Sequence, residues 1–215
     1  MSEKRLLVEG AGNGNDSKNQ KVRCRAGFKK FLEKADPTFR AFQIEPKGGR
    51  RQAYDAFKSD HESGKWCFVA LWLDSEDPIT NKEAPWAHIA NRKDDKMPRP
   101  EGVTDNQVLL MATSMETLLA ADPDALEEHY GHGFTRKDLP SAVDLEERSR
   151  DAVFRALQAA TRGCNKSYSK GDHSFALLEK IDPATIQEVL PSFARTVRVL
   201  KENLQACPPT RAKKG

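Results

Sequence analysis

The stretch Trp66-Cys-Phe-Val-Ala-Leu-Trp-Leu73 (WCFVALWL) is a continuous apolar run of eight residues, and Asp-Ser-Glu-Asp-Pro follows it directly. A run of this length, bounded by turn-forming residues, is typical of a strand that is buried on both faces. Strands of that kind occur in parallel sheets whose two faces are covered by helices. The run therefore predicts the central strand of a parallel sheet.

The residues on the amino-terminal side of this strand alternate between strand and helix patterns. A short apolar segment at residues 4–8 and a β-prone segment at Phe39 to Ile44 predict two further strands. The spacing of apolar residues predicts helices over residues 18–35 and 50–61. A strand–helix–strand–helix–strand order favours right-handed crossovers, so we expect an α/β, Rossmann-like, mostly parallel sheet flanked by helices.

The residues after the central strand are mainly helical in pattern. Residues 107–112 predict a fourth strand, and residues 78–104 predict a long loop with a short helix at 85–90. Further helices are expected at residues 115–121, 123–130, 145–161, 175–181, 183–190 and 193–205. We expect an α/β core at 1–135, a helical extension packed on it at 136–207, and a basic disordered tail at 208–215. A single domain with a helical cap fits the pattern equally well.

Composition limits the class of protein. The chain has 215 residues, of which 38% are hydrophobic and 31% are charged. No apolar run approaches the ~18 residues of a membrane span, and the N-terminus has no signal-peptide pattern. We therefore expect a cytoplasmic protein without a membrane partner. The P-loop, HExxH and GxSxG motifs are all absent, which argues against an ATPase, a zincin or a hydrolase of the GxSxG type.

Basic residues are concentrated in the first part of the chain. Residues 1–60 hold 14 Lys and Arg against 8 Asp and Glu, although the net charge of the whole chain is only +3. Such a surface can bind a phosphate backbone, and the expected nucleic-acid-binding residues are Arg25, Lys29, Arg50 and Arg51. The tail adds Arg211, Lys213 and Lys214. The alternative is an ordinary solvated helix face.

Acidic residues follow two of the predicted strands at their carboxyl ends. Glu9 follows the first strand, and Asp74, Glu76 and Asp77 follow the third. If these strands are neighbours, their carboxylates converge at the crevice where α/β sheets bind ligands. Converging carboxylates repel one another unless a cation joins them, and Mg²⁺ or Mn²⁺ suits such oxygen ligands. Gly10, Gly12 and Gly14 would let a substrate approach the backbone. The alternative is a solvated turn in which Asp74 caps a following segment.

The pairing of Val-Glu-Gly after the first strand with Asp-Ser-Glu-Asp after the third resembles the TOPRIM domain. TOPRIM domains occur in topoisomerases, primases and OLD-type nucleases, and they bind Mg²⁺ for phosphodiester chemistry. The resemblance places Glu9 at the glutamate of the signature and Asp74 at its first aspartate. Glu76 stands where the signature has a second aspartate, and Asp77 is the neighbouring acid that could replace it.

A longer pattern resembles one family of bacterial TOPRIM-like proteins classed as a domain of unknown function. Relatives are often encoded beside SMC/ABC-type ATPases in anti-phage loci, which implies a nuclease effector. By analogy with OLD-type relatives, Lys170 would support the metal centre by neutralising charge. The matching stretches lie between residues 8 and 183 and include Val8-Glu9-Gly10, Gly48-Gly49-Arg50, Asp74 to Pro78, Met115-Glu116 and Tyr168-x-Lys170.

Three further positions are candidates for a functional role because of their residue type and their place in the predicted elements. Glu116 lies among apolar residues of a predicted helix, and a carboxylate there needs a metal or a basic partner. Gly48-Gly49-Arg50 opens a predicted helix and has the composition of an anion site, although a plain turn fits equally well. His173 could transfer protons or could be a hydrogen-bonded structural histidine.

Two functions are compatible with these patterns. The first is a Mg²⁺-dependent TOPRIM phosphodiesterase that cuts DNA or RNA, with Glu9, Asp74, Glu116 and Lys170 at its catalytic centre. Glu9, Asp74 and Glu76 or Asp77 would be its metal ligands. The second is a non-catalytic regulatory subunit whose helical half docks on an SMC/ABC-type ATPase. The Glu at position 76 favours the second, because its longer side chain shifts a ligand atom by about one bond length.

Overall fold

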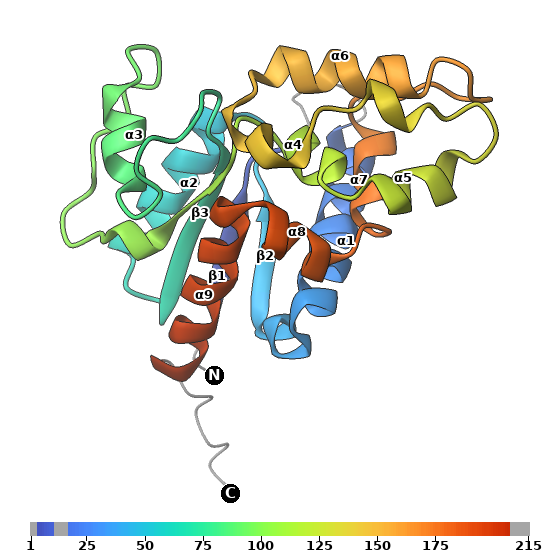
Figure 1. Cartoon of the computed structure of the whole chain (residues 1–215). Coiled ribbons are helices and arrows are strands. Elements are labelled where there is room, and N and C mark those ends of the chain that lie inside the picture. The colour runs from blue at the N-terminus through green and yellow to red at the C-terminus, as the bar shows by residue number, and fades with distance from the viewer. Residues whose placement is uncertain (1–3, 11–16, 207–215) are drawn as a thin grey trace, which may run out of the picture.

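Four parallel strands form the centre of the structure, a computed structural model that describes residues 4–10 and 17–206 (Figure 1). The strands are β1 (Lys4–Val8), β2 (Phe42–Pro46), β3 (Phe68–Asp74) and β4 (Val108–Met111). Their order in the sheet is β2-β1-β3-β4, and every neighbouring pair is parallel. The predicted α/β class is confirmed. Gly12 and Gly14, and the basic residues of the tail, lie outside the described residues.

The central strand β3 is buried on both faces, as its apolar sequence predicts. Its residues alternate between two hydrophobic clusters, because successive side chains of a strand point to opposite faces. Val69, Leu71 and Leu73 belong to the cluster under α2 (Arg50–Glu62) and α3 (Pro85–Asn91). Phe68, Ala70 and Trp72 belong to the larger cluster on the other face, where α1 (Ser17–Ala35) packs (Figure 1). The sheet is therefore the middle of three layers.

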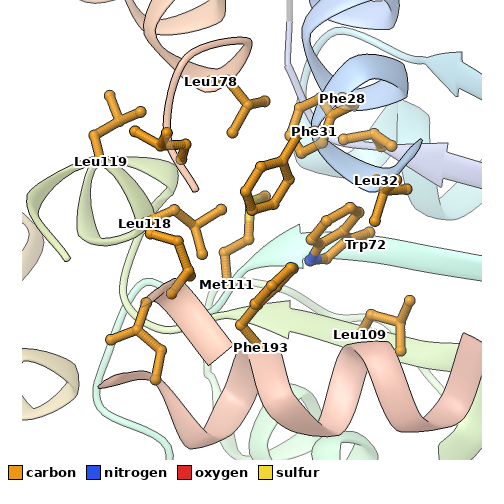
Figure 2. Close-up of a cluster of buried hydrophobic side chains, with 14 of the residues drawn as sticks. Phe28, Phe31, Leu32, Trp72, Leu109, Met111, Leu118, Leu119, Leu178 and Phe193 are labelled. Atoms are coloured by element: carbon orange, nitrogen blue, oxygen red, sulfur yellow. The ribbon is translucent and has the colours of Figure 1, made fainter. Parts of the chain in front are cut away.

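Aromatic side chains fill the larger cluster (Figure 2). Trp72 of β3 is fully buried, and its ring meets that of Phe28 of α1 edge-on, with centroids 5.0 Å apart. Phe31 of α1 packs against Phe193 of α9 (Pro191–Ala206) at 4.9 Å. Truncating side chains of this size to alanine typically costs about 3–5 kcal/mol. Helix α9, close to the end of the chain, is thus packed into the same core as the first helix.

The second half of the chain is helical, as expected. The cluster that holds Trp72 also contains Leu145 and Val153, so it joins residues on both sides of position 135. The division of the chain at that position stays a prediction. Among the described residues, no helix is long and apolar enough to span a membrane. The helices are α4 (Met115–Ala120), α5 (Pro123–Tyr130), α6 (Arg150–Ala160), α7 (Asp172–Leu178) and α8 (Pro183–Val189).

Three predicted elements were wrong in their bounds by three residues or more, and one of them is the helix expected at residues 175–181, which is α7 at Asp172–Leu178. The strand expected from Phe39 begins only at Phe42, because Asp36 caps a 3-10 helix at Pro37–Ala41 through the backbone N–H of Thr38. The helix expected over residues 145–161 is divided into a 3-10 helix at Ala142–Glu147 and α6. Ser149 causes the second start, since its hydroxyl accepts from the N–H of Ala152 as a helix N-cap. The division makes Arg150 the first residue of a helix.

Helices α1 and α7 touch at Gly27, and this contact supports one wall of the site described below. A Cβ atom at Gly27 would lie 2.8 Å from the carbonyl oxygen of Phe175, a backbone atom that cannot turn aside. We expect Gly27→Ala to destabilise the protein by about 1–3 kcal/mol, because overpacking outweighs the ~1 kcal/mol of helix propensity that alanine gains. Urea unfolding measures the change. Lys29→Ala, at an exposed position of the same helix, is the control and should change stability little.

Candidate functional site

The acidic residues that follow β1 and β3 lie side by side. The two strands are paired with Val8 opposite Trp72, and the N–H of Glu9 donates to the carbonyl of Trp72 at 3.0 Å. Asp74 is the last residue of β3. The carboxyl ends of neighbouring parallel strands therefore place Glu9 and Asp74 at one edge of the sheet, as the sequence predicts.

A pocket of about 250 Å³ lies at this edge. All four residues predicted to be catalytic line it, although they come from four separate parts of the chain. Glycines and an aromatic ring form much of the remaining wall. The lining residues are Glu9, Gly10, Gln20, Gly48, Asp74, Met115, Glu116, Lys170, Gly171, Ser174 and Phe175. The structure thus brings the predicted residues together, and their catalytic role stays a prediction.

The carboxylates in this pocket share an excess of negative charge. Burial raises the pKa of Asp74 to about 8, and the neighbouring carboxylates of Glu9 and Glu116 add to the effect. Burial also raises the pKa of Glu9, against the opposing influence of Arg50 and the backbone N–H of Asp74. Both raised pKa values mean that the buried carboxylates resist ionisation, and a bound cation would stabilise their ionised forms.

Arg50 is held beside these acids as a fixed charge. Its Nε and Nη2 donate to the two carboxylate oxygens of the nearly buried Asp95, at 2.8 and 2.7 Å. Its Nη1 lies 3.5 Å from Glu9 and donates to the carbonyl of Asp74. The Nε of Arg92 donates to Oδ2 of the same carboxylate at 3.1 Å. Most of the Arg50 guanidinium is thus already engaged by protein acceptors, and its role in nucleic-acid binding stays a prediction.

Glu116 is fixed by a buried hydrogen-bond chain. The hydroxyl of Tyr168 donates to its Oε1 at 2.8 Å, and the hydroxyl of Ser174 donates in turn to Tyr168 at 2.7 Å. Glu116, Tyr168 and Ser174 are each no more than 3% exposed. The ammonium of Lys170 lies 3.7 Å from the other oxygen, Oε2. The partner that a buried glutamate requires is thus a tyrosine together with a lysine.

Asp74 has a second, structural task. Its Oδ1 accepts from the backbone N–H of Met115 at 2.9 Å, at the start of α4. Asp74 therefore caps a helix that begins 41 residues later in the chain, in addition to facing the pocket. This bond fixes the carboxylate and leaves its other oxygen for the pocket.

The chain from Glu116 to Ser174 yields a stability prediction. Tyr168→Phe keeps the ring but removes the hydroxyl, so Glu116 and Ser174 each lose a buried partner. We expect a loss of about 1–3 kcal/mol in the free energy of unfolding. Ser174→Ala in the Tyr168→Phe background should cost less than Ser174→Ala alone, because the two hydroxyls share one bond. Additive losses in this double-mutant cycle, measured by chemical unfolding, would contradict the chain.

Glu76 and Asp77 do not line the pocket. Glu76 has a φ of +68°, an uncommon conformation for a residue with a side chain, and its carboxylate pairs with Arg150. Asp77 is exposed and pairs with Arg92. The turn after β3 follows the neighbouring chain segment instead, with the N–H of Glu76 bonded to the carbonyl of Thr113 at 2.9 Å. The acids that the sequence offers as the second metal position are therefore held by arginines outside the pocket.

Arg150 is the residue that sequence reasoning missed. Its charge lowers the pKa of Glu9 and of Asp74, although burial outweighs it at both, so it lies close enough to act on the acidic group. Ser149, the residue before Arg150, is a typical helix N-cap and predicts a helix start. The local sequence does not show that this start lies near the ends of β1 and β3.

The other predicted nucleic-acid-binding residues lie apart from the pocket. Arg25 donates to the carbonyl of Ile44 at 3.0 Å and to Glu45 at 3.2 Å. Lys29 pairs with Glu33 along α1. Arg51 is exposed, pairs with Asp55 at 3.0 Å and lies over the ring of Tyr54. His173 lies in a different depression, with its Nδ1 3.3 Å from the hydroxyl of Ser169.

The donor chemistry of the pocket suits a hard divalent cation. Glu9 and Asp74 offer carboxylate oxygens, and burial raises the pKa of both. As placed, no three Asp, Glu, His or Cys side chains of residues 4–10 and 17–206 stand close enough to enclose an ion. A cation here would thus keep several water ligands, as Mg²⁺ usually does in proteins.

Comparison with known proteins places the chain in a family. The family model described as "Domain of unknown function (DUF4276)" matches residues 12–201, which is most of the chain. No curated protein and no solved structure matches it. Because the match spans well over half of its residues, this chain belongs to the DUF4276 family of proteins.

Proposed function

We propose that this protein is a Mg²⁺-dependent phosphodiesterase of the TOPRIM type that cuts DNA or RNA. The observation that supports the proposal is the convergence of Glu9, Asp74, Glu116 and Lys170 on one pocket. The acids stand at the carboxyl ends of two adjacent parallel strands, where α/β folds place their ligands. The resemblance of Val-Glu-Gly and Asp-Ser-Glu-Asp to the TOPRIM signature supports the same reaction class.

The first two acids would hold the cation. Glu9 and Asp74 are fixed by a backbone bond or a helix cap, so their oxygens would need little rearrangement. When bound, Mg²⁺ would polarise a phosphoryl oxygen and lower the pKa of a water molecule. Gly10 and Gly48 bring the backbone to the pocket wall on this side, and a Cβ atom at Gly10 would lie 3.1 Å from the Sγ of Cys24.

Lys170 would stabilise negative charge, and Glu116 would accept a proton. The Lys170 ammonium lies at the pocket wall, where it can bind a phosphate oxygen and offset the charge that develops there. The Oε1 of Glu116 is occupied by Tyr168, so Oε2 is the atom that can accept a proton from an attacking water. Arg150 pairs with Glu76 outside the pocket, and its charge favours the ionised forms of Glu9 and Asp74.

A cleavage assay with the purified full chain tests this function. Single-stranded DNA, duplex DNA, total RNA and tRNA are incubated with the protein in Mg²⁺, in Mn²⁺ and in EDTA. Cleavage of at least one class with either metal and none with EDTA is the expected result. If an effector role beside an SMC/ABC-type ATPase holds, the same assay with that ATPase and ATP present should cut faster. Metal-independent cleavage would contradict the proposal.

The turn after β3 favours a second candidate, a non-catalytic regulatory subunit that docks on such an ATPase. Glu76 and Asp77, the acids at the second position of the signature, are paired with arginines outside the pocket. A docking protein would act through its helical surface. Growth inhibition by the expressed protein that survives Glu9→Gln but is lost on charge reversal at exposed Arg155 of α6 would support docking.

A further inference from the structure

Asp95 is a buried acid that lies close to the acidic pocket but is not part of its wall. It lies in the turn after α3, and its side chain is only 6% exposed. Its local sequence, Lys93-Asp-Asp-Lys96, is typical of a solvated loop. A buried carboxylate needs hydrogen bonds and opposite charge, and Arg50 and Arg92 supply both. The position of Asp95 is therefore tied to these two arginines.

Asp95 contacts Arg50 more closely than Glu9 does. The Nε and Nη2 of Arg50 lie 2.8 and 2.7 Å from the two oxygens of Asp95, in the paired geometry typical of arginine with a carboxylate. The Nη1 of Arg50 donates to the carbonyl of Asp74 and lies 3.5 Å from Glu9, which is long for a hydrogen bond. Asp95 thus sets the orientation of the guanidinium, and Glu9 has the weaker contact.

The turn that carries Asp95 is fixed on α2, the helix that begins at Arg50. The ring of Trp86 in α3 meets that of Tyr54 in α2 edge-on, with centroids 6.5 Å apart. The hydroxyl of Tyr54 donates to the carbonyl of Pro98 at 2.5 Å. Asp95 lies between Trp86 and Pro98 in the chain, so contacts on both sides of it hold the turn against α2. The pairing of Asp95 with Arg50 is therefore supported by the packing around it.

The charge of Arg50 affects the same carboxylate that a cation would use. Burial raises the pKa of Glu9, the charge of Arg50 opposes this effect, and the charge of Asp95 adds to it. An arginine that forms a full ion pair with Glu9 would compete with a metal ion for the carboxylate oxygens and would repel the ion. Asp95 satisfies the guanidinium within the protein and so reduces that competition.

We propose that Asp95 is a positioning residue of the cation site, which holds the guanidinium of Arg50 away from Glu9 and leaves the Glu9 oxygens open to a divalent cation. The inference rests on the proposed function, because it requires that Glu9 and Asp74 hold such a cation. Residues that orient the surroundings of metal ligands typically change metal affinity about 10–100-fold when they are replaced.

Calorimetric titration of the full chain with Mn²⁺ tests the inference through binding alone. Asp95→Asn should weaken Mn²⁺ binding about tenfold or more, because an amide with one oxygen cannot accept from both guanidinium nitrogens and Arg50 is then free to pair with Glu9. Asp94→Asn makes the same chemical change at the preceding, exposed residue and is the matched control. It should bind Mn²⁺ as tightly as the wild type. Circular dichroism confirms that each variant is folded.

Arg50→Gln separates an effect through Arg50 from a direct effect of the Asp95 charge. This variant lacks the competing guanidinium, so it should bind Mn²⁺ at least as tightly as the wild type. In this background Asp95→Asn should change the affinity far less than it does in the wild type. Equal losses in the two backgrounds overturn the inference. Weaker binding in Arg50→Gln than in the wild type also overturns it, and that result does not require Asp95→Asn to fold.

Glu9→Gln distinguishes a failure of this inference from a failure of the proposed function. Wild-type protein that binds no Mn²⁺, or binds it as tightly as Glu9→Gln does, overturns the cation site and this inference together. If Glu9→Gln loses binding while Asp95→Asn binds as tightly as the wild type, the cation site holds and this inference alone is overturned.

Discussion

Asp74→Asn is expected to reduce metal-dependent cleavage by several orders of magnitude while leaving the protein folded. Phosphoryl transfer depends on the position of the metal and on charge stabilisation, so the loss of one ligand carboxylate removes most of the rate. The amide keeps an oxygen that can accept from the N–H of Met115, so the cap of α4 survives. Glu9→Gln should behave in the same way.

Asp77→Asn is the matched control for this experiment. It makes the same chemical change three residues later, at an exposed side chain outside the pocket. Rates are compared at saturating Mg²⁺ on the best substrate of the cleavage assay, and circular dichroism confirms that each variant is folded. If Asp77→Asn is as inactive as Asp74→Asn, the ligands are those of the linear signature, and the turn must rearrange on metal binding. Full activity of both Asp74→Asn and Glu9→Gln would rule out the acidic pocket as the active site.

The wild-type protein is expected to lose stability as the pH rises from about 4 to about 8, through the titration of Asp74. Its pKa is about 8 in the folded protein, against an ordinary value of 3.8. Between these values the folded state binds the proton that the unfolded state has released, so the free energy of unfolding falls with rising pH. Above pH 8 and below pH 4 this contribution is flat. The expected size is on the order of a few kcal/mol.

Urea unfolding at pH 5 and pH 8 measures this effect. Asparagine does not titrate, so Asp74→Asn should lose the Asp74 part of the pH dependence and become more stable relative to wild type at pH 8 than at pH 5. Adding Mg²⁺ at pH 8 should stabilise the wild type by mass action and the variant far less. Equal pH dependence in the two proteins would show that Asp74 is not the strongly shifted group.

The order of elements could be predicted from the chain because each element has a local pattern. The apolar run at residues 66–73 predicts a strand that needs a helical layer on each face. The helical spacing in residues 18–35 and 50–61 predicts the helices of those two layers. The predicted bounds of β2 and α6 were wrong because a capping hydrogen bond competes there with the spacing of apolar residues. The Asp36 cap places Phe39 in a 3-10 helix before strand β2. The Ser149 cap starts a new helix within a segment whose apolar spacing predicts one continuous helix.

The sequence by itself determined that Glu9 and Asp74 follow two predicted strands, and the pairing of β1 with β3 in the tertiary structure brings them together. The sequence did not determine their surroundings. Long-range packing brings Lys170 to the pocket wall, Tyr168 to Glu116 and Arg150 near Asp74, on segments that begin well after the sheet is complete. The turn that draws Glu76 to Arg150 likewise depends on a bond to Thr113. The order of strands and helices along the chain follows from local patterns, whereas strand pairing and partners distant in sequence are fixed only when the whole core packs.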